Sequence, residues 1–397
     1  MAQPRAGFQA IVREAKTNFD FQRDFAETKA EISAGTNHKK FELKTKKGKF
    51  MKTGIQTLTA TVALLSLVAV AQAQFTPDDL VVLRDGAGLA ALSGAGTAIY
   101  LDQYTTSGAF VNTLAIPSTG SSALVNSGSA ASEGQLSLSA NGQYLVFAGY
   151  NVAAGTLGVA GASSSTVPRG IATVNSAGTY SLAATTTSFY SANNIRGGTS
   201  DGNGNFWGAG PVTGSGTVYM GTGTPAQIAT NNSLVVQDIG GNLFFSTAKG
   251  TTGIYEISGT PTSGLVTPTL VLANAAPSDF AFNANLTIAY VANTAGGIQR
   301  YDNGVLSYTL DGGTGMNGLA VDFSGTHPLI YATTEDGKNL IEITDTGSGS
   351  IANTLATAST YEAFRGLEFA VPEPSTLALA GMGLAALWSF HRRNRKS

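Results

Sequence analysis

The chain has no cysteine among its 397 residues, and it has only three histidines. Without cysteine it cannot form disulfides, thiolate metal sites or a cysteine nucleophile. The long middle part of the chain contains a single histidine, His327, which is followed by a proline. Because one histidine cannot build a multi-histidine metal centre, we expect His327 to be structural or simply exposed.

Positive charge is also scarce in the middle of the chain. Residues 74–371 contain seven Lys and Arg against 18 Asp and Glu, although the net charge of the whole chain is only −2. Most of the other basic residues lie in residues 1–50 and 392–396. Since phosphate groups bind to clustered positive charge, nucleic acid is not an expected partner of the middle part.

Charged residues of all kinds make up only 12 % of the sequence, whereas glycine occurs 49 times. A helical protein would need more Glu, Lys and Leu. Abundant Gly with Ser, Thr, Ala and Asn is typical of many short strands joined by tight turns. We therefore predict an all-β body.

Residues 51–73 have every part of a secretory signal peptide. Lys52 precedes an apolar run from Leu58 to Val70, which is followed by small residues. As a helix this run would measure roughly 20 Å, too short to span a ~30 Å hydrocarbon core. The predicted signal peptidase site comprises Ala71, Ala73 and Gln74.

A signal peptide normally begins a chain, yet 50 residues, many of them polar or charged, precede this one. We interpret Met51 as the true start and residues 1–50 as a non-native or disordered extension. The alternative is a cytoplasmic extension on an uncleaved anchor. N-terminal sequencing of the exported protein distinguishes the two.

Residues 372–397 contain three parts in a fixed order. Pro372, Glu373 and Pro374 end the body, an apolar helix is predicted from about residue 376 to 390, and a basic cluster follows at 392–396. The positive-inside rule keeps that cluster in the cytoplasm and leaves the body on the outer side. The alternative is an ordinary C-terminal membrane anchor.

This tail resembles the PEP-CTERM sorting domain, in which a Val-Pro-Glu-Pro-Ser/Thr motif, a short membrane helix and a terminal Arg cluster form the signal. The resemblance implies an inner-membrane intermediate that an exosortase processes near Pro372, Glu373 and Pro374. These residues would be recognised and not catalytic. It also implies delivery to the cell surface or the medium, in association with extracellular polysaccharide and biofilm matrix.

Between the two signals, residues 74–371 contain a repeat of two apolar runs separated by a polar turn. Five copies occur, at residues 136–150, 197–210, 235–248, 279–293 and 319–334. Each predicts a β-hairpin, and one or two further strands follow it. Four strands per repeat are typical of a β-propeller blade. Residues 201–207 and 238–244 resemble the blades of NHL-like propellers.

The two ends of this body are predicted to share a blade. The strand at residues 365–371 lacks partners, and the strands at 79–85, 97–104 and 110–116 lack an inner strand. Pairing them would close the ring and remove exposed edges. We predict six blades, or seven if residues 117–135 or 150–170 contain further strands.

Some residues are candidates for ligand contacts in the central channel. Arg196 and Arg365 each precede a glycine at the start of an inner strand and could contact an anionic or sugar ligand, the alternative being a carboxylate neighbour. Asp238, Asp279 and Asp322 are candidates for binding calcium, although no cofactor is required by the sequence. Residues 201–205 resemble half a calcium loop, but Phe206 stands where glycine is needed, so we predict a turn.

The sequence has no catalytic motif, because neither a nucleophile elbow with usable partners nor a phosphate loop is present. We therefore expect an exported, monomeric binding or structural protein associated with exopolysaccharide or biofilm. The alternative is a metal-dependent, lactonase-like or lyase-like propeller enzyme, which requires several oxygen ligands to converge in the channel.

Overall fold

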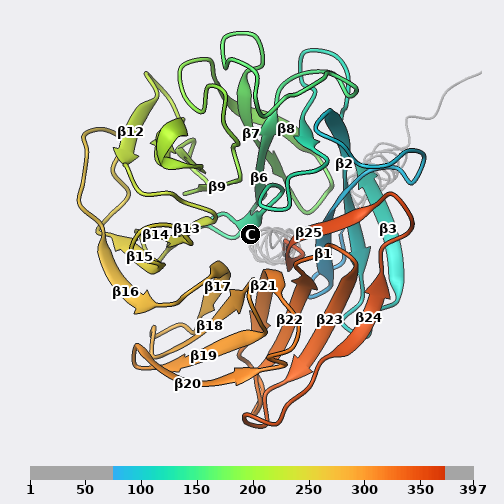
Figure 1. Ribbon diagram of the computed structural model, residues 1–397, viewed down its shortest axis with the longest axis vertical. Coiled ribbons are helices and arrows are strands. Elements are labelled where there is room, and N and C mark those ends of the chain that lie inside the picture. Colours follow the sequence, from blue (N-terminus) through green and yellow to red (C-terminus); the bar gives the residue numbers. More distant parts are fainter. Residues whose placement is uncertain (1–74, 372–397) are drawn as a thin grey trace, which may run out of the picture. The chain divides into compact units, whose positions relative to one another are not determined.

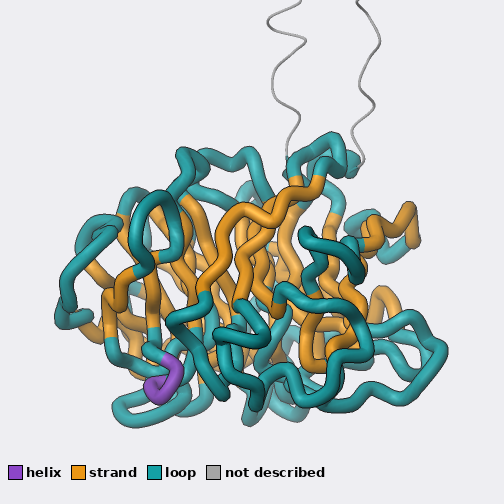
Figure 2. The backbone as a smooth tube through the Cα atoms, turned by 90° about the horizontal axis from the view of Figure 1, so that it is seen from above, coloured by secondary structure: helices purple, strands orange, loops and turns teal. Residues whose placement is uncertain are grey.

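The computed structural model describes residues 75–371. Strands and turns make up this body, and its one helical segment is a 3-10 turn, η2 (Val212–Gly214). Figure 2 shows this turn in purple among strands and loops. No helix within residues 75–371 is both long and apolar enough to cross a membrane. The body is all-β, as its composition predicts, and the predicted C-terminal membrane helix lies outside the described residues.

Four of the sheets have four antiparallel strands each, and in every one the strands pair in chain order. These sheets consist of β9 (Gly197–Ser200), β10 (Phe206–Ala209), β11 (Thr217–Tyr219) and β12 (Ala226–Ala229); β13 (Val236–Ile239), β14 (Asn242–Thr247), β15 (Gly253–Ile257) and β16 (Thr269–Ala273); β17 (Pro277–Phe282), β18 (Ile288–Asn293), β19 (Ile298–Asp302) and β20 (Val305–Leu310); and β21 (Met316–Asp322), β22 (Leu329–Thr334), β23 (Asn339–Thr344) and β24 (Asn353–Thr357).

The fifth sheet has nine strands and contains two groups of four. The closing group consists of β25 (Ala363–Phe369), β1 (Leu80–Asp85), β2 (Gly96–Tyr104) and β3 (Phe110–Ala115). The β5–β8 group consists of β5 (Leu136–Leu138), β6 (Leu145–Tyr150), β7 (Arg169–Val174) and β8 (Tyr180–Thr186). The short strand β4 (Val125–Ser127) pairs with both β2 and β6, so it joins the two groups.

The first and last strands of the body pair with each other. β25 lies antiparallel to β1, with Leu80 opposite Phe369 and Asp85 opposite Ala363. The predicted pairing of the two chain ends is therefore present. Because β1 also pairs with β2, both of its edges are hydrogen-bonded and neither is left for another chain.

Apolar layers lie between neighbouring groups around a ring. Figure 1 shows β9, β13, β17 and β21 toward the centre and β12, β16, β20 and β24 at the rim. Val146 packs near Val218 between the β5–β8 group and the next sheet, and Tyr331 near Leu367 between the β21–β24 sheet and the closing group. Since middle strands are covered on both faces, they are nearly continuous apolar runs, as in β6.

The five hairpins predicted from the repeat all occur as antiparallel strand pairs. Two stretches were candidates for additional strands. Of these, residues 117–135 contain only β4, and residues 151–168 form turns without a strand. The fold is thus β-propeller-like, and each four-stranded group has the connectivity expected of a blade.

Candidate functional site: buried polar groups and inter-sheet clefts

Arg365 pairs with a buried carboxylate. Its Nε lies 2.9 Å from Oδ2 of Asp85, and the two side chains are 5 % and 0 % exposed. Its Nη2 donates to the carbonyl of Gly128 at 3.1 Å, and Asn126 donates to the other oxygen of Asp85 at 2.9 Å. The carboxylate neighbour that the sequence left as the alternative is therefore present, and a ligand contact at Arg365 stays a prediction.

Arg196, directly before β9, has no ion pair within the described residues. Its Nη1 donates to Oδ1 of Asn232 and to the carbonyl of Ser233, both at 3.0 Å. Burial lowers the pKa of this guanidinium, and the nearby charge of Glu133 partly offsets that lowering. Its Nε is buried without a partner. A ligand contact at Arg196 stays a prediction.

Asp279 links neighbouring sheets near the centre of the ring. It is 1 % exposed. Its Oδ1 accepts from the side-chain amide of Gln237 in β13 at 3.1 Å, and its Oδ2 accepts from the N–H of Leu319 in β21 at 3.0 Å. Because Asp279 lies in β17, these bonds connect three first strands, and the carboxylate has a structural role.

Asp238 and Asp322 each accept a backbone hydrogen bond in a hairpin turn, from Gly241 at 3.1 Å and from Ser324 at 2.8 Å. Within residues 75–371, no three His, Cys, Asp or Glu side chains are placed to hold a metal ion. The structure therefore does not bring the three predicted calcium ligands, the third being Asp279, together into one site.

Two other residues lie as the sequence predicts. Asp201 accepts backbone hydrogen bonds from Asn203 at 2.7 Å and Asn205 at 3.2 Å, which makes residues 201–205 a self-contained turn. His327 is exposed, and its Nδ1 lies 3.1 Å from the carbonyl oxygen of Asp345.

A buried carboxyl group that sequence reasoning missed lies beside β4. Glu133 is 0 % exposed. Its Oε2 accepts from the N–H of Ser127 at 2.7 Å, and its Oε1 accepts from the hydroxyl of Tyr150 at 2.6 Å and from the amide of Asn194. Burial raises the pKa of Glu133 to about 7 even though these donors favour the charged form. Its burial depends on loops far apart in sequence, so no local signal reveals it.

This raised pKa predicts a pH-dependent stability. The unfolded chain ionises Glu133 near its ordinary pKa of 4.5, whereas the folded body resists ionisation until about pH 7. The stabilisation is therefore complete below pH 4.5 and is lost as pH rises through 7. It amounts to roughly 2–3 kcal/mol. We expect the denaturant concentration at the unfolding midpoint of the wild type to decrease as the pH is raised from 5 to 8. That of Glu133→Gln should decrease less steeply.

The control for this experiment is Glu335→Gln, which changes an exposed carboxyl and should keep the wild-type slope. Some slope will remain in Glu133→Gln, because burial also raises the pKa of Glu368 to about 7. Identical slopes for Glu133→Gln and the wild type would contradict the assignment.

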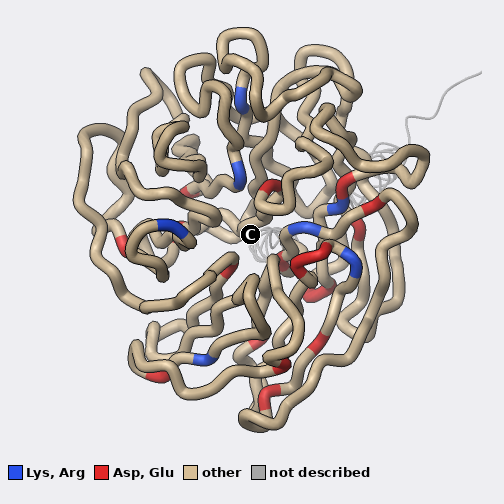
Figure 3. The backbone as a smooth tube through the Cα atoms, viewed as in Figure 1, with Lys and Arg blue, Asp and Glu red and all other residues tan. Residues whose placement is uncertain are grey.

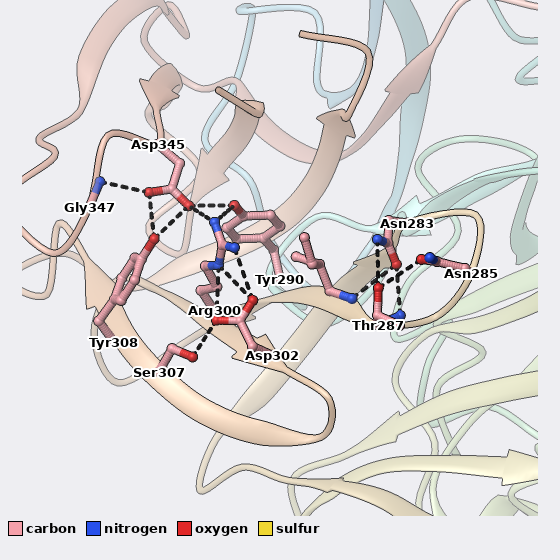
Figure 4. A network of polar contacts seen from close by, with 11 residues as sticks. Asn283, Asn285, Thr287, Tyr290, Arg300, Asp302, Ser307, Tyr308, Asp345 and Gly347 are labelled. Atoms are coloured by element: carbon pink, nitrogen blue, oxygen red, sulfur yellow. Dashed lines mark hydrogen bonds and ion pairs between the residues drawn. The ribbon is translucent and has the colours of Figure 1, made fainter. Parts of the chain in front are cut away.

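A second polar cluster joins the β17–β20 and β21–β24 sheets (Figure 4). Asp345 accepts from the hydroxyl of Tyr290, from Nη1 of Arg300 at 2.8 Å and from the hydroxyl of Tyr308 at 2.9 Å. Burial alone would raise the pKa of Asp345, but these donors lower it below its usual range. Arg300 also pairs with Asp302 at 2.9 Å. Because these groups satisfy one another, the cluster is a structural link between the sheets.

Three clefts open between neighbouring sheets, each lined by the turn that follows the first strand of a sheet, so they lie at the same end of the ring. One, of about 650 Å³, lies between the β21–β24 sheet and the closing group and is lined by Asp78, Asp79, Thr106, Val321, Asp322, Phe323, Ser324, Leu329, Tyr331 and Phe369. A second, of about 480 Å³, lies between the β17–β20 and β21–β24 sheets and includes Arg300 and Phe323.

The third cleft, of about 340 Å³, lies between the β5–β8 group and the β9–β12 sheet. It is lined by Tyr144, Thr173, Ser181, Ala183, Ser200, Gly202, Gly204 and Phe206. All three clefts have the size of small-molecule sites, about 300–1,000 Å³. Figure 3 shows basic segments at several places around the ring, with some of them close to acidic segments on one side of the centre.

The end of the chain matches a known sorting signal. Residues 370–395 match the PEP-CTERM protein-sorting motif. This protein is exported and sorted by an exosortase. The PEP-CTERM motif holds it transiently in the membrane before its release to the cell surface. Of the matched segment the structure describes only Ala370 and Val371, which are 3 % and 0 % exposed.

The predicted sorting residues Pro372, Glu373 and Pro374 therefore fall within the match but outside the described residues. The predicted signal peptidase site of Ala71, Ala73 and Gln74 also lies outside them, as do the signal peptide and the N-terminal extension.

No curated protein matches the chain. Among solved structures, it is similar to a periplasmic gluconolactonase from Pseudomonas aeruginosa, with 12 % identity, a TM-score of 0.39 and coverage of 70 % of this chain and 83 % of that one. A gluconolactonase from Xanthomonas campestris has 12 % identity, a TM-score of 0.40 and coverage of 73 % and 89 %. A functionally unknown protein from Desulfotomaculum acetoxidans has 13 % identity, a TM-score of 0.41 and coverage of 74 % and 90 %.

Proposed function

We propose that this protein is an exported, non-enzymatic binding protein that attaches to extracellular polysaccharide at the cell surface. The observation that carries the proposal is the PEP-CTERM motif at residues 370–395, which delivers the body to the place where such polymers lie. The clefts of the body support it, because aromatic rings beside hydroxyl and carboxylate groups suit the apolar faces and hydroxyls of sugars.

The charge of the body favours a neutral polymer. Residues 74–371 carry seven basic and 18 acidic residues, so a polyanion approaching the surface would be repelled. Six of the seven basic side chains are engaged in ion pairs or carbonyl contacts within the fold, namely Arg84, Arg169, Arg196, Arg300, Lys338 and Arg365. The proposed partner is therefore an uncharged exopolysaccharide.

We further propose that the body is a six-bladed propeller and acts as a monomer. The closing group, the β5–β8 group and the four separate sheets supply one blade each, and β4 is then a link between two blades. Support comes from the common strand order of the groups and from the β25–β1 pairing, which closes the ring within one chain.

The test of the proposed function uses the protein as the cell releases it. The protein is mixed with polysaccharide purified from the same organism, and the mixture is separated by size-exclusion chromatography. We expect the protein to elute with the polymer at high mass, and equally so at high salt because the polymer is neutral. A neutral dextran of similar mass is the control. Elution of the protein alone at every polymer concentration would contradict the proposal.

A further inference from the structure

The cleft between the β5–β8 group and the β9–β12 sheet, here called the Tyr144 cleft, is built from side chains that share one face of a sheet. Thr173 in β7 lies directly opposite Ser181 in β8 and also opposite Val146 in β6. Residues opposite each other in antiparallel strands point to the same face. Tyr144, two residues before Val146, lies on that face as well. Phe206 and Ser200, a cross-strand pair of the next sheet, form the other wall.

The glycines of the β9–β10 turn keep the Tyr144 cleft open. Gly202 and Gly204 have φ of +79° and +97°, which side chains rarely adopt. At Gly204 an added Cβ would meet nothing within 4 Å, so open space lies beside it. At Gly202 the space is occupied by Asn141, whose amide donates to the Gly202 carbonyl at 3.2 Å. This contact joins the turns of the two groups that form the cleft.

Three hydroxyl groups of the Tyr144 cleft have no partner in the described part of the chain. Thr173 is buried, since only 7 % of the residue is exposed. No hydrogen bond to its hydroxyl occurs within residues 75–371, and the oxygen is not sealed in the core. The hydroxyls of Ser181 and Tyr144 likewise lack partners within these residues. In contrast, the Ser200 hydroxyl already donates to the carbonyl of Asn205 at 2.8 Å.

The chemistry of the lining selects a class of ligand. No lining residue carries a charge at neutral pH, whereas the other two clefts contain aspartates or an arginine. Phe206 and Tyr144 are half-buried, and both pack against the apolar layer behind the cleft. A pyranose presents an apolar C–H face that packs on an aromatic ring and hydroxyls that exchange hydrogen bonds with unpaired hydroxyls.

We infer that the Tyr144 cleft binds a neutral sugar ring, with Tyr144 and Phe206 packing on it and Thr173 and Ser181 hydrogen-bonding to its hydroxyls. This inference rests on the proposed function and names the place and the chemical class of the sugar unit. Because a volume of about 340 Å³ is at the small end of ligand sites, the cleft takes one or two rings of a polymer.

The test measures binding of glucose, galactose, mannose and N-acetylglucosamine, with glucuronic acid as the charged comparator. Saturation-transfer NMR and titration are carried out on the full-length protein in a detergent without a sugar headgroup. The test variant is Thr173→Val with Ser181→Ala. Because these hydroxyls make no internal hydrogen bond, the melting curve should not change. Affinity for the neutral sugar should fall about tenfold or more, since each lost hydrogen bond weakens binding several-fold.

The matched control is Ser324→Ala with Thr326→Val, which removes two exposed hydroxyls from the other two clefts and should leave sugar binding unchanged. Equal affinity of the test variant and the wild type, or tighter binding of glucuronic acid than of the neutral sugars, would overturn the inference. Polysaccharide binding without any sugar binding at this cleft would overturn the inference alone. Sugar binding at the cleft without retention on the polymer would overturn only the proposed function.

Discussion

Replacing Arg365 with methionine is expected to lower the free energy of unfolding by about 3–5 kcal/mol, because it leaves Asp85 as a buried charge without its cationic partner. Asp85 is 0 % exposed, and the amide of Asn126 would be its one remaining side-chain donor within the described residues. With a total stability of about 5–15 kcal/mol for a domain, this is a large fraction. For a body of this size the melting temperature should fall by roughly 10 °C.

The position of this ion pair makes the effect important for the whole ring. Arg365 lies in β25 and Asp85 in β1, so the pair joins the last strand of the body to the first. Neighbouring polar groups extend the link, since Arg84 contacts both Asp102 and, at 2.8 Å, Glu362. Loss of the Arg365–Asp85 pair would therefore weaken the contact that closes the ring.

This prediction is tested by urea denaturation, monitored by tryptophan fluorescence, and by calorimetry. The matched control is Lys338→Met, which removes an ion pair whose side chains are 71 % and 51 % exposed and should change stability by less than about 0.5 kcal/mol. The double variant Asp85→Asn with Arg365→Met should be more stable than Arg365→Met, since no buried charge remains. If Arg365→Met is as stable as the wild type, the pair does not hold the ring closed.

Changing Pro372, Glu373 and Pro374 to alanine is expected to abolish release of the protein and to leave it in the inner membrane. The PEP-CTERM motif is the part of the chain by which the exosortase recognises its substrate. The buried core residues Ala370 and Val371, which directly precede these positions, are kept in this variant. The protein should thus fold normally and fail only in sorting.

Cell fractionation with immunoblotting measures the distribution between membrane and medium, and mass spectrometry of the released protein locates its C-terminus. The control replaces Thr119, Ser121 and Ser122, three exposed loop residues, with alanine and should be released like the wild type. Release of the Pro-Glu-Pro variant at the wild-type rate would show that another signal sorts the protein.

The two ends of the ring differ in chemistry. At the end where the first strands begin, Glu133 accepts hydrogen bonds from Ser127, Tyr150 and Asn194, and Arg365 pairs with Asp85. At the end where the first strands finish, clefts open between neighbouring groups. The Asp345 cluster also links two sheets at this second end, so the clefts lie beside a polar link.

Much of the architecture could be predicted because it depends on local patterns. Alternating apolar residues around a Gly or Asn turn form the hairpins at residues 136–150 and 235–248, since side-chain period and turn geometry are properties of a few neighbouring residues. At the two chain ends, the lack of partners for the predicted strands led to the prediction that they pair, as β25 and β1 do. The strand β12 was not located, and β4 lies in residues 117–135, where further strands were only an alternative, because three or four residues carry too little pattern.

Sequence alone determined the all-β class, the hairpin repeat, the pairing of the chain ends and the PEP-CTERM motif, each inferred from composition or from local strand and motif patterns. Only the tertiary structure decided which polar residues are available to a ligand. Arg365 meets Asp85 across 280 positions of sequence, and Thr173 keeps an unpaired hydroxyl in a cleft between two sheets. Burial and hydrogen-bond partners arise from the packing of distant segments, so no local pattern could specify them.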